Sequence, residues 1–295
     1  MRKFIYSISI ISICFILIIG CLEFLFKNTP NYIEDLFEKL ESNDSTQVLL
    51  LGNSHIQALE EPIIDGTESF NFGVGGQDIY HMHMILEHVL VKMNKKHLKQ
   101  VIIGLDYDLL GYSYKTANSI WLDRLYYPVT GKLSENSFGA VLMAKSNFFR
   151  ANRDFSKLTF VNSNLNSKNK DLNFLDYSPC DKRAKEHSET KFNKSLISDN
   201  IKLLESIYSL CKNHNIRLTL INLPKGNCYY DFYNKDVVYS AQKILRDFSK
   251  NKDVVFYDLW KSDEFNDEMF SDNDHLNNLG KKQLHLKLKF NSFKK

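Results

Sequence analysis

The sequence is poor in cysteine, and its few cysteines do not form the pairs that zinc and dithiol sites use. Five of the 295 residues are cysteine, and none belongs to a C-x-x-C motif, so neither kind of centre is expected. Cys14 and Cys21 lie in an N-terminal apolar stretch, whereas Cys180, Cys211 and Cys228 lie in the body. Three body cysteines allow at most one intramolecular disulfide, and their spacing leaves the pairing open.

The chain also lacks the basic excess that nucleic-acid-binding domains carry. Its formal net charge is +3, and Arg2, Lys3 and Lys27 against Glu23 place two of those charges in or beside the N-terminal stretch. The body is therefore close to neutral, with no basic stripe and no DNA-binding motif. A nucleic-acid partner is not expected.

One long apolar run is present, and it lies at the N-terminus. Phe4 to Phe26 follows the short basic start Met1-Arg2-Lys3 and contains a single charge, Glu23. A run of this length can cross a bilayer as a helix, and a basic start stays in the cytoplasm. We expect a membrane anchor at 1–27 and a stalk at 28–45. The body then faces outward.

The same stretch has a second interpretation. Ile18-Ile19-Gly20-Cys21 resembles a bacterial lipoprotein cleavage box, with lipid attached to Cys21. The apolar residues Leu22 to Phe26 that follow favour an uncleaved anchor instead. In either case the body is tethered to the outer face of a membrane.

Beyond the stalk, apolar runs of strand length alternate with segments of helical periodicity. This pattern predicts an α/β fold in which helices cover both faces of a parallel sheet. The polar stretch 111–193 has no clear period and is too long for a plain loop, so we expect an insertion after the third strand of a single body domain, 46–295, partly helical near 137–149. The expected strands are 47–53, 70–72, 101–107, 217–223 and 254–259, and the expected helices are 31–43, 79–93, 196–214, 237–248 and 277–290.

Polar residues follow the expected strands, where open parallel sheets bind ligands. Ser54 follows the first strand, the turn Gly73-Val74-Gly75-Gly76 follows the second, and Asp106 and Asp108 follow the third. These residues should therefore meet at one edge of the sheet.

An Asp and a His lie three residues apart near the C-terminus, at Asp272 and His275. A serine hydroxyl becomes a nucleophile when an imidazole removes its proton and a carboxylate orients that imidazole. The chain supplies all three groups, so Ser54, His275 and Asp272 are the candidate catalytic residues.

Simpler roles compete with these. Ser54 could cap the helix after the first strand, since serine is a favoured N-cap. Asp272-Asn273-Asp274 could bind Ca²⁺, although the glycine and distal Glu of an EF-hand are missing. His81, His83 and His88 could bind a metal, although His81 and His83 do not share a helix face. The aromatics Trp121, Tyr126, Tyr127 and Trp260 could stack on sugar rings, although core packing is more frequent.

Three blocks together resemble the SGNH (GDSL-type) hydrolase superfamily over about residues 46–290. They are Gly52-Asn53-Ser54-His55, Asn71-Phe72-Gly73-Val74-Gly75-Gly76, and Asp272-Asn273-Asp274-His275 continued through Gly280. The resemblance implies a three-layer sandwich with Ser54 as nucleophile, His275 as base and Asp272 orienting it. It further implies that the amides of Ser54 and Gly76 hold the oxyanion, and that His55, Gly75 and Asp106 line the pocket.

One block departs from the family pattern. The family usually has Gly-x-Asn-Asp after the third strand, and its Asn side chain donates to the oxyanion; the alignment places Asp108 there. An ionised Asp cannot donate a hydrogen bond. This departure and the N-terminal anchor resemble a membrane-anchored branch that acylates bacterial surface polymers, such as the alginate O-acetylation and teichoic acid D-alanylation proteins.

That branch implies an extracytoplasmic enzyme that O-acetylates a surface polysaccharide through an acyl-serine. Its expected partners are a polysaccharide or other hydroxyl acceptor and a multi-pass membrane protein that delivers the acyl group, because there is no acyl-CoA pool outside the cytoplasm. No cofactor and no metal are expected. The alternatives are a carbohydrate esterase with water as acceptor, and a non-catalytic polysaccharide-binding or assembly protein.

Overall fold

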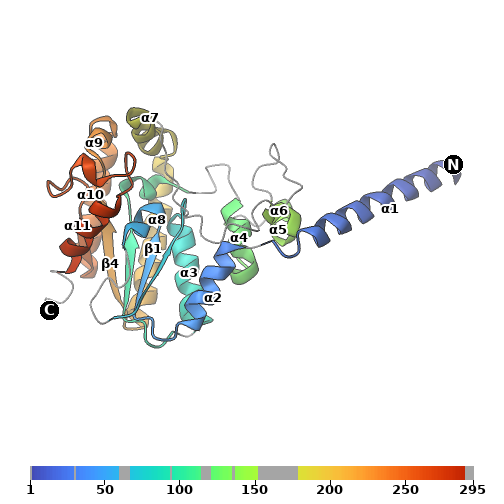
Figure 1. Cartoon of the computed structure of the whole chain (residues 1–295), viewed down its shortest axis with the longest axis horizontal. Coiled ribbons are helices and arrows are strands. Elements are labelled where there is room, and N and C mark those ends of the chain that lie inside the picture. The colour runs from blue at the N-terminus through green and yellow to red at the C-terminus, as the bar shows by residue number, and fades with distance from the viewer. Residues whose placement is uncertain are drawn as a thin grey trace. The chain divides into compact units, whose positions relative to one another are not determined.

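A five-stranded parallel sheet forms the centre of the body, with the strand order β2-β1-β3-β4-β5 (Figure 1). The computed structural model describes residues 2–29, 31–59, 67–93, 95–113, 121–134, 137–151 and 179–289. The predicted α/β class with a parallel sheet is confirmed. The strands are β1 (Val48–Gly52), β2 (Ser69–Gly73), β3 (Gln100–Gly104), β4 (Arg217–Asn222) and β5 (Val255–Asp258).

Helices cover both faces of this sheet. Successive strand side chains point to opposite faces, and Val48, Leu50, Ile102 and Ile221 form one buried cluster with Leu284 and Leu288 of α11 (Asn278–Lys289). On the other face, α3 (Ile79–Val91) contacts β1, α8 (Ile197–Asn213) contacts β4, and the two helices pack together (Figure 1). The predicted three layers are therefore present.

Most predicted elements occur within a few residues of their expected ends. The stalk helix is α2 (Tyr32–Ser42), and the helix expected at 237–248 is longer, as α10 (Lys235–Lys252). The third strand is shorter than predicted, because it ends at Gly104 and the chain then turns into the 3-10 helix η2 (Tyr107–Gly111), where the amide of Leu109 donates to the carbonyl of Asp106.

Three glycines let the turn after β1 pack directly on the strand ends. This turn is the 3-10 helix η1 (Ser54–Ala58), and its Ile56 is fully buried. A Cβ atom would lie 3.0 Å from Ile56 at Gly52, 2.2 Å at Gly73 and 2.9 Å at Gly104. Only glycine gives Ile56 room at those places, so the three strand ends fix the position of η1.

A disulfide joins a short helix near the end of the predicted insertion to another short helix after β4. Cys180 of α7 (Cys180–Lys185) is bonded to Cys228 of α9 (Asn227–Phe232). Cys211 is a buried free thiol, and burial raises its pKa to about 12. The structure thus pairs Cys180 with Cys228, which the sequence left open.

The N-terminal helix α1 (Arg2–Leu25) is long and apolar enough to cross a membrane. Lys3–Leu25 contains a window of mean hydropathy 2.7, none of which is buried. A 23-residue helix exceeds the roughly 20 residues that a bilayer requires.

The chain divides into two compact units. One holds Met1–Phe37 and Ile120–Lys170, and the other holds Glu38–Ser119 and Asp171–Lys295. Within the first unit the structure describes α1, α4 (Trp121–Thr130), α5 (Phe138–Lys145) and α6 (Asn147–Ala151). Residues 152–178 of the predicted insertion lie outside the described residues, and the domain boundaries at 27, 45, 111 and 193 stay a prediction.

The glycine contacts with Ile56 give a stability prediction. Gly73→Ala should lower the free energy of unfolding by about 1–3 kcal/mol, because the added methyl overlaps Ile56 in a packed site. Chemical denaturation of both proteins measures the change. In an Ile56→Ala background the same substitution should cost less, since the nearest overlapping atom, Ile56 Cγ2, is gone and Asn71 Oδ1 at 2.9 Å remains. Gly139→Ala is the matched control, because nothing lies within 4 Å of a Cβ atom at Gly139. Equal costs for Gly73→Ala in both backgrounds would refute the close approach.

Candidate active site

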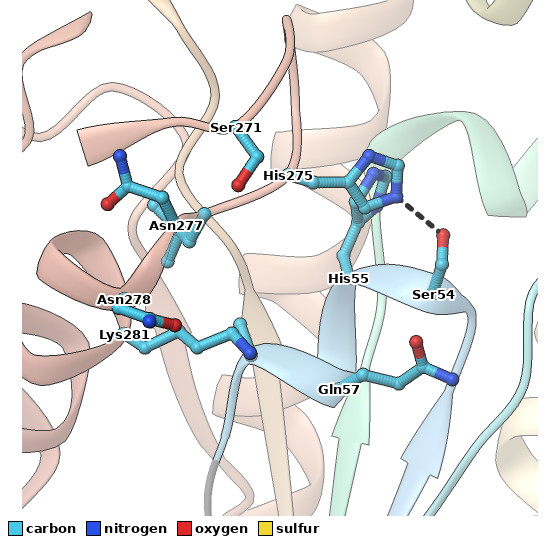
Figure 2. A pocket seen from close by; sticks show the side chains of 10 residues that line it. Ser54, His55, Gln57, Ser271, His275, Asn277, Asn278 and Lys281 are labelled. Carbon is cyan, nitrogen blue, oxygen red and sulfur yellow. Dashed lines mark hydrogen bonds between the residues drawn. The ribbon is translucent and has the colours of Figure 1, made fainter. Parts of the chain in front are cut away.

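The structure brings the three candidate catalytic residues into one hydrogen-bonded chain. Ser54 Oγ lies 2.8 Å from His275 Nε2 (Figure 2). His275 Nδ1 lies 2.8 Å from Asp272 Oδ2 and 3.1 Å from Asp272 Oδ1. A proton on Nδ1 bonded to the carboxylate leaves the Nε2 lone pair facing the hydroxyl, as a serine nucleophile requires.

Backbone hydrogen bonds hold the loop that carries His275. Asp272 Oδ1 accepts from the amides of Asp274 at 3.0 Å and His275 at 2.7 Å. The amide of Ser271 donates to the carbonyl of His275 at 2.7 Å, which closes the loop. Asp272 therefore fixes the backbone of His275 as well as its ring.

The residues after His275 start α11 and hold it close to the loop. Asn277 Oδ1 accepts from the amides of Leu279 and Gly280 at the helix start. Its Nδ2 donates to the carbonyl of Glu268 at 2.7 Å. A Cβ atom at Gly280 would lie 2.3 Å from the carbonyl oxygen of Met269. The Leu-Asn-x-x-Gly extension of the histidine block thus has a structural explanation.

Asn53, and not Ser54, caps the turn after β1. Asn53 Oδ1 accepts from the amide of His55 at 3.0 Å, as the N-cap of η1. The interpretation of Ser54 as the N-cap is therefore wrong. Because the neighbouring side chain does the capping, the Ser54 hydroxyl is available to His275.

His55 lies beneath the nucleophile between two buried carboxylates. Its Nδ1 is 2.5 Å from Asp106 Oδ2, and its Nε2 is 3.0 Å from Asp274 Oδ2. The ring centroids of His55 and His275 are 4.6 Å apart. His55 was expected to line the pocket, and it does so, while its side chain also reaches into the protein.

Two buried cations balance these carboxylates. Lys225 Nζ lies 3.1 Å from Asp106 Oδ1 and 2.7 Å from His55 Nδ1. Arg183 Nε donates to Asp274 Oδ1 at 2.7 Å. Lys225 is only 1% exposed, and a buried charge of this kind is retained only where it is paired. We call His55, Asp106, Asp274, Lys225 and Arg183 the buried charge cluster.

Sequence reasoning missed both cations. Lys225 follows β4 at the carboxyl edge of the sheet, the place where the other polar site residues were sought. Arg183 lies on α7, in the aperiodic stretch that gave no signal. The strand-end rule could have found Lys225, whereas Arg183 needed the tertiary structure.

The pKa values of the two histidines are shifted in opposite directions. Burial works against protonation of His55, but Asp106 and Asp274 outweigh it and raise the pKa of His55. Burial lowers the pKa of His275, with the neighbouring His55 acting in the same direction. A neutral His275 is the form that accepts the serine proton.

Asp106 and Asp108 have different surroundings. Asn53 Nδ2 donates to Asp106 Oδ2 at 2.8 Å, so Asp106 connects the turn that carries Ser54 to the buried charge cluster. Asp108 accepts from the Tyr233 hydroxyl at 3.2 Å. Burial and the nearby Asp106 carboxylate raise the pKa of Asp108 to about 6. Asp106 is therefore the acid that is bonded to Asn53, beside Ser54. The oxyanion role expected of Asp108 stays a prediction.

The glycine block holds the turn beside Ser54. The amide of Val74 donates to the carbonyl of Gly52 at 3.1 Å. Gly76 has a φ of 81°, in the region that favours glycine. Asn71 Nδ2 donates to the carbonyls of Ile56 and Leu59, each at 2.9 Å. The block thus packs against η1, while the roles of the Gly76 amide and of Gly75 remain predictions.

A pocket opens beside Ser54. It is a cavity of about 100 Å³ formed by η1, the His275 loop and the start of α11 (Figure 2). The lining residues are Ser54, His55, Gln57, Ala58, Ser271, His275, Leu276, Asn277, Asn278 and Lys281.

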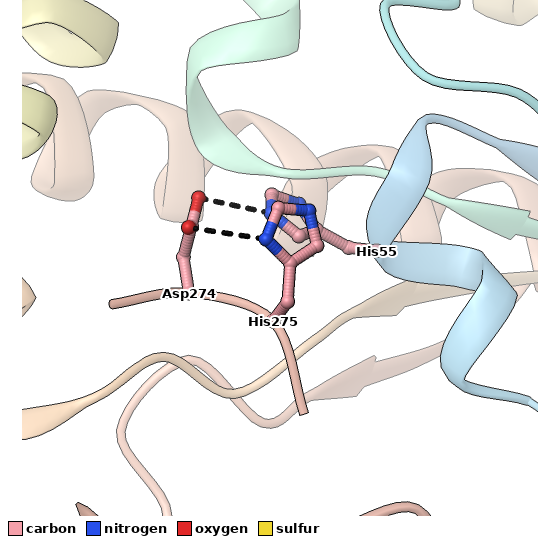
Figure 3. Close-up of side chains that lie close together, drawn as sticks. All are labelled: His55, Asp274 and His275. Atoms are coloured by element: carbon pink, nitrogen blue, oxygen red, sulfur yellow. Dashed lines mark hydrogen bonds and ion pairs between the residues drawn. The ribbon is translucent and has the colours of Figure 1, made fainter. Parts of the chain in front are cut away.

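Among the described residues, one group has the spacing of a metal site. Ligand atoms of His55, Asp274 and His275 lie within 4.8 Å of one another (Figure 3). Arg183 contacts the same Asp274 carboxylate, and His275 Nδ1 is bonded to Asp272. The donor atoms therefore already have partners, and a dication there would face two buried cations.

Several residues considered above for metal binding or for stacking on sugars instead make contacts within the protein. His81 Nδ1 lies 2.7 Å from Asp78, which caps α3, and His83 Nε2 lies 2.8 Å from Ser206 on α8. Tyr126 and Trp260 are buried, which is the core packing considered above.

Comparisons with known proteins found partial likeness. A family model matches residues 160–291, less than half of the chain. No curated protein matches the sequence. One matching crystal structure is a provisionally named acylhydrolase of Bacteroides fragilis, with 10% identity, a TM-score of 0.43, and 84% of this chain and 89% of that chain covered. Another is a GDSL-like lipase of Bacteroides thetaiotaomicron, with 10% identity, a TM-score of 0.43, and 88% and 95% covered. Likeness at this level carries no argument about chemistry, which rests on the geometry above.

The opposite shifts of the two histidines give a pH prediction. The rate at which a fluorophosphonate labels Ser54 should fall as pH drops through the pKa of His275, which lies below its ordinary 6.5. His55→Gln removes a positive neighbour and leaves the Asp274 carboxylate, so the fall should move to higher pH. His83→Gln, a partly buried histidine bonded to Ser206, is the control. An unmoved profile in a folded His55→Gln protein would show that His55 does not tune His275.

Proposed function

We propose that this protein is a membrane-anchored serine acyl-transfer enzyme that acts outside the cytoplasm on hydroxyl groups of a bacterial surface polysaccharide. The observation that carries the proposal is the hydrogen-bonded chain from Ser54 through His275 to Asp272. The sequence predicted that Ser54 and His275 would meet, although they are 221 positions apart. Such a convergence at a pocket is the geometric test of a serine nucleophile.

The proposed reaction has two balanced steps. In the first, Ser54 Oγ bonds to the acyl carbonyl carbon while its proton moves to His275 Nε2. That proton then passes to the departing oxygen of the donor, whose bond to the acyl carbon breaks. In the second, an acceptor hydroxyl gives its proton to His275 and bonds to the acyl carbon, and Ser54 regains the proton as it leaves.

Backbone amides are the proposed donors to the oxyanion. The amides of Ser54 and Gly76 lie in the turn after β1 and the turn after β2, which the Val74–Gly52 hydrogen bond joins. Each such donor is worth about 3 kcal/mol in comparable enzymes. Asp106 and Asp274 instead support the site from beneath, because their oxygens are taken by the cations and His55.

The pocket supports a short acyl group and a polar acceptor. Its volume of about 100 Å³ is below the roughly 300–1,000 Å³ of sites that enclose drug-sized ligands. An acetyl group fits such a space better than a long acyl chain. Gln57, Asn278 and Lys281 line the side on which the acceptor would approach, and they suit hydroxyl-bearing ligands.

The acyl donor is proposed to come from a membrane partner. A body outside the cytoplasm has no acyl-CoA, so an acyl group must be delivered across the membrane. A multi-pass membrane protein is the chemically simplest source. An acyl ester of the polysaccharide itself as donor and water as acceptor would make the same residues an esterase.

Activity with and without an acceptor separates these functions. Detergent-solubilised full-length protein should release acid from an aryl acetate slowly, and it should transfer acetyl to an added oligosaccharide, as mass spectrometry would detect. Ser54→Ala should lower both activities at least about 10³-fold. Its stability should be nearly unchanged, because Asn53 and not Ser54 provides the cap.

Two other results of this assay would each support a different function. Rapid acid release with no acetylated sugar would replace the transferase proposal by the esterase. Activities unaffected by Ser54→Ala would remove Ser54 from the chemistry and support a non-catalytic polysaccharide-binding protein.

The proposed topology has its own test. With α1 as an anchor whose basic start stays in the cytoplasm, alkaline phosphatase fused after Lys295 should be active in cells. A green fluorescent protein that does not fold after export, fused at the same place, should stay dark. The reverse pattern would place the body in the cytoplasm and rule out a surface function.

A further inference from the structure

The helix α5 presents an apolar side to the outside of its unit. Phe138 is 85% exposed and Leu142 is 54% exposed. They are four residues apart and so lie on the same side of the helix. Outside α1, Phe138 is more exposed than any other large apolar residue for which the structure describes the side chain.

The opposite side of α5 is packed within its own unit. Ala140 and Ala144 are buried in a cluster with Leu133, against which Tyr127 and Val141 pack. Ser137 caps the helix start, where its hydroxyl accepts from the amide of Ala140. The helix is therefore held by its small residues, and its two largest apolar side chains are directed away from that core.

The end of α1 is attached to the helix that follows α5. Glu23 in the last turn of α1 accepts from the amide of Asn147 at 2.7 Å and from the Ser146 hydroxyl. The rings of Phe26 and Phe148 pack edge to face with centroids 5.4 Å apart. Ser146 is also the residue that ends α5. The last turn of α1 is therefore hydrogen-bonded to the residue that directly follows α5.

We infer that α5 lies in the lipid–water interface beside the anchor, with Phe138 and Leu142 inserted into the bilayer. The occupant of this apolar side is lipid because α1, in the same unit, contains a long apolar window of which nothing is buried. Charge agrees with this, since the exposed Lys145 follows Leu142 on the same side and Lys27 is exposed just after α1, where lipid phosphates would lie.

This inference rests on the proposed membrane anchor and adds a second attachment. By itself, α1 would leave its unit free to rotate about the axis of the helix and to tilt together with it. An interfacial α5 would fix the tilt of this unit relative to the membrane surface. Nothing in this step depends on the serine chemistry.

Fluorescence quenching in vesicles tests the inference. Full-length protein is reconstituted in vesicles of phosphatidylcholine and phosphatidylglycerol, with or without bromine on the acyl chains. Phe138→Trp should add emission that is blue-shifted and quenched by brominated lipid, above the background of the two native tryptophans. Phe15→Trp within α1 is the positive control, and Tyr239→Trp, 72% exposed on α10, is the negative control.

The controls separate the ways in which the inference can fail. Quenched Phe15→Trp with unquenched, red-shifted Phe138→Trp would show α5 in water and overturn the inference alone. Blue-shifted but unquenched Phe138→Trp would show α5 covered by protein, such as a second copy, and would also overturn it. Unquenched Phe15→Trp would overturn both the anchor and the interfacial helix while leaving the Ser54 assay unaffected.

Discussion

The packing of Ile56 against Gly52, Gly73 and Gly104 is the constraint on which the site depends. These glycines end three adjacent strands, and each would place a Cβ atom within about 3 Å of Ile56. The turn η1 can therefore lie directly on the carboxyl edge of the sheet, with Ser54 at its first position. A larger residue at any of the three places would lift the turn, and Ser54 would lose its 2.8 Å contact with His275.

A second constraint joins the two halves of the catalytic chain through the protein interior. Ser54 and His275 come from segments far apart in sequence, and the buried charge cluster connects them through Asp106, His55 and Asp274. Replacing such a cluster by apolar groups often costs nothing in stability, whereas removing one member leaves an uncompensated charge. Here the cluster holds His55 in position, because each carboxylate fixes one side of the ring. Lys225 and Arg183 neutralise the two carboxylates.

The sheet and the meeting of Ser54, Asp272 and His275 at one edge of it were predictable because their signals are local. Strand-length apolar runs ended at polar residues, Ser54 followed the first of them, and Asp272 and His275 lie three residues apart after the fifth. The cluster was not predictable, because a buried Lys or Arg looks like a surface residue until its partner is known. The alignment placed Asp108 at the family's Asn position, and the structure shows that Asp106 is the acid bonded to Asn53 while Asp108 accepts from Tyr233. A cap role for Ser54 competed with the nucleophile role because Asn53 and Ser54 are both good caps, and only the hydrogen bonds distinguish them.

The division of the site into a charged floor and a polar wall bears on transfer against hydrolysis. The floor, made by the cluster, places His55 beside His275, where it acts with burial to lower the pKa of His275, and it is indifferent to the acceptor. The wall, made by η1 and the start of α11, contains Gln57, Asn278 and Lys281 and faces the space an acceptor would enter. Water and a sugar hydroxyl would use the same base at the same distance. Selection between them must therefore come from wall residues that hold a sugar long enough to react before water, so changes that convert one activity into the other belong on η1 and α11 and leave the triad intact.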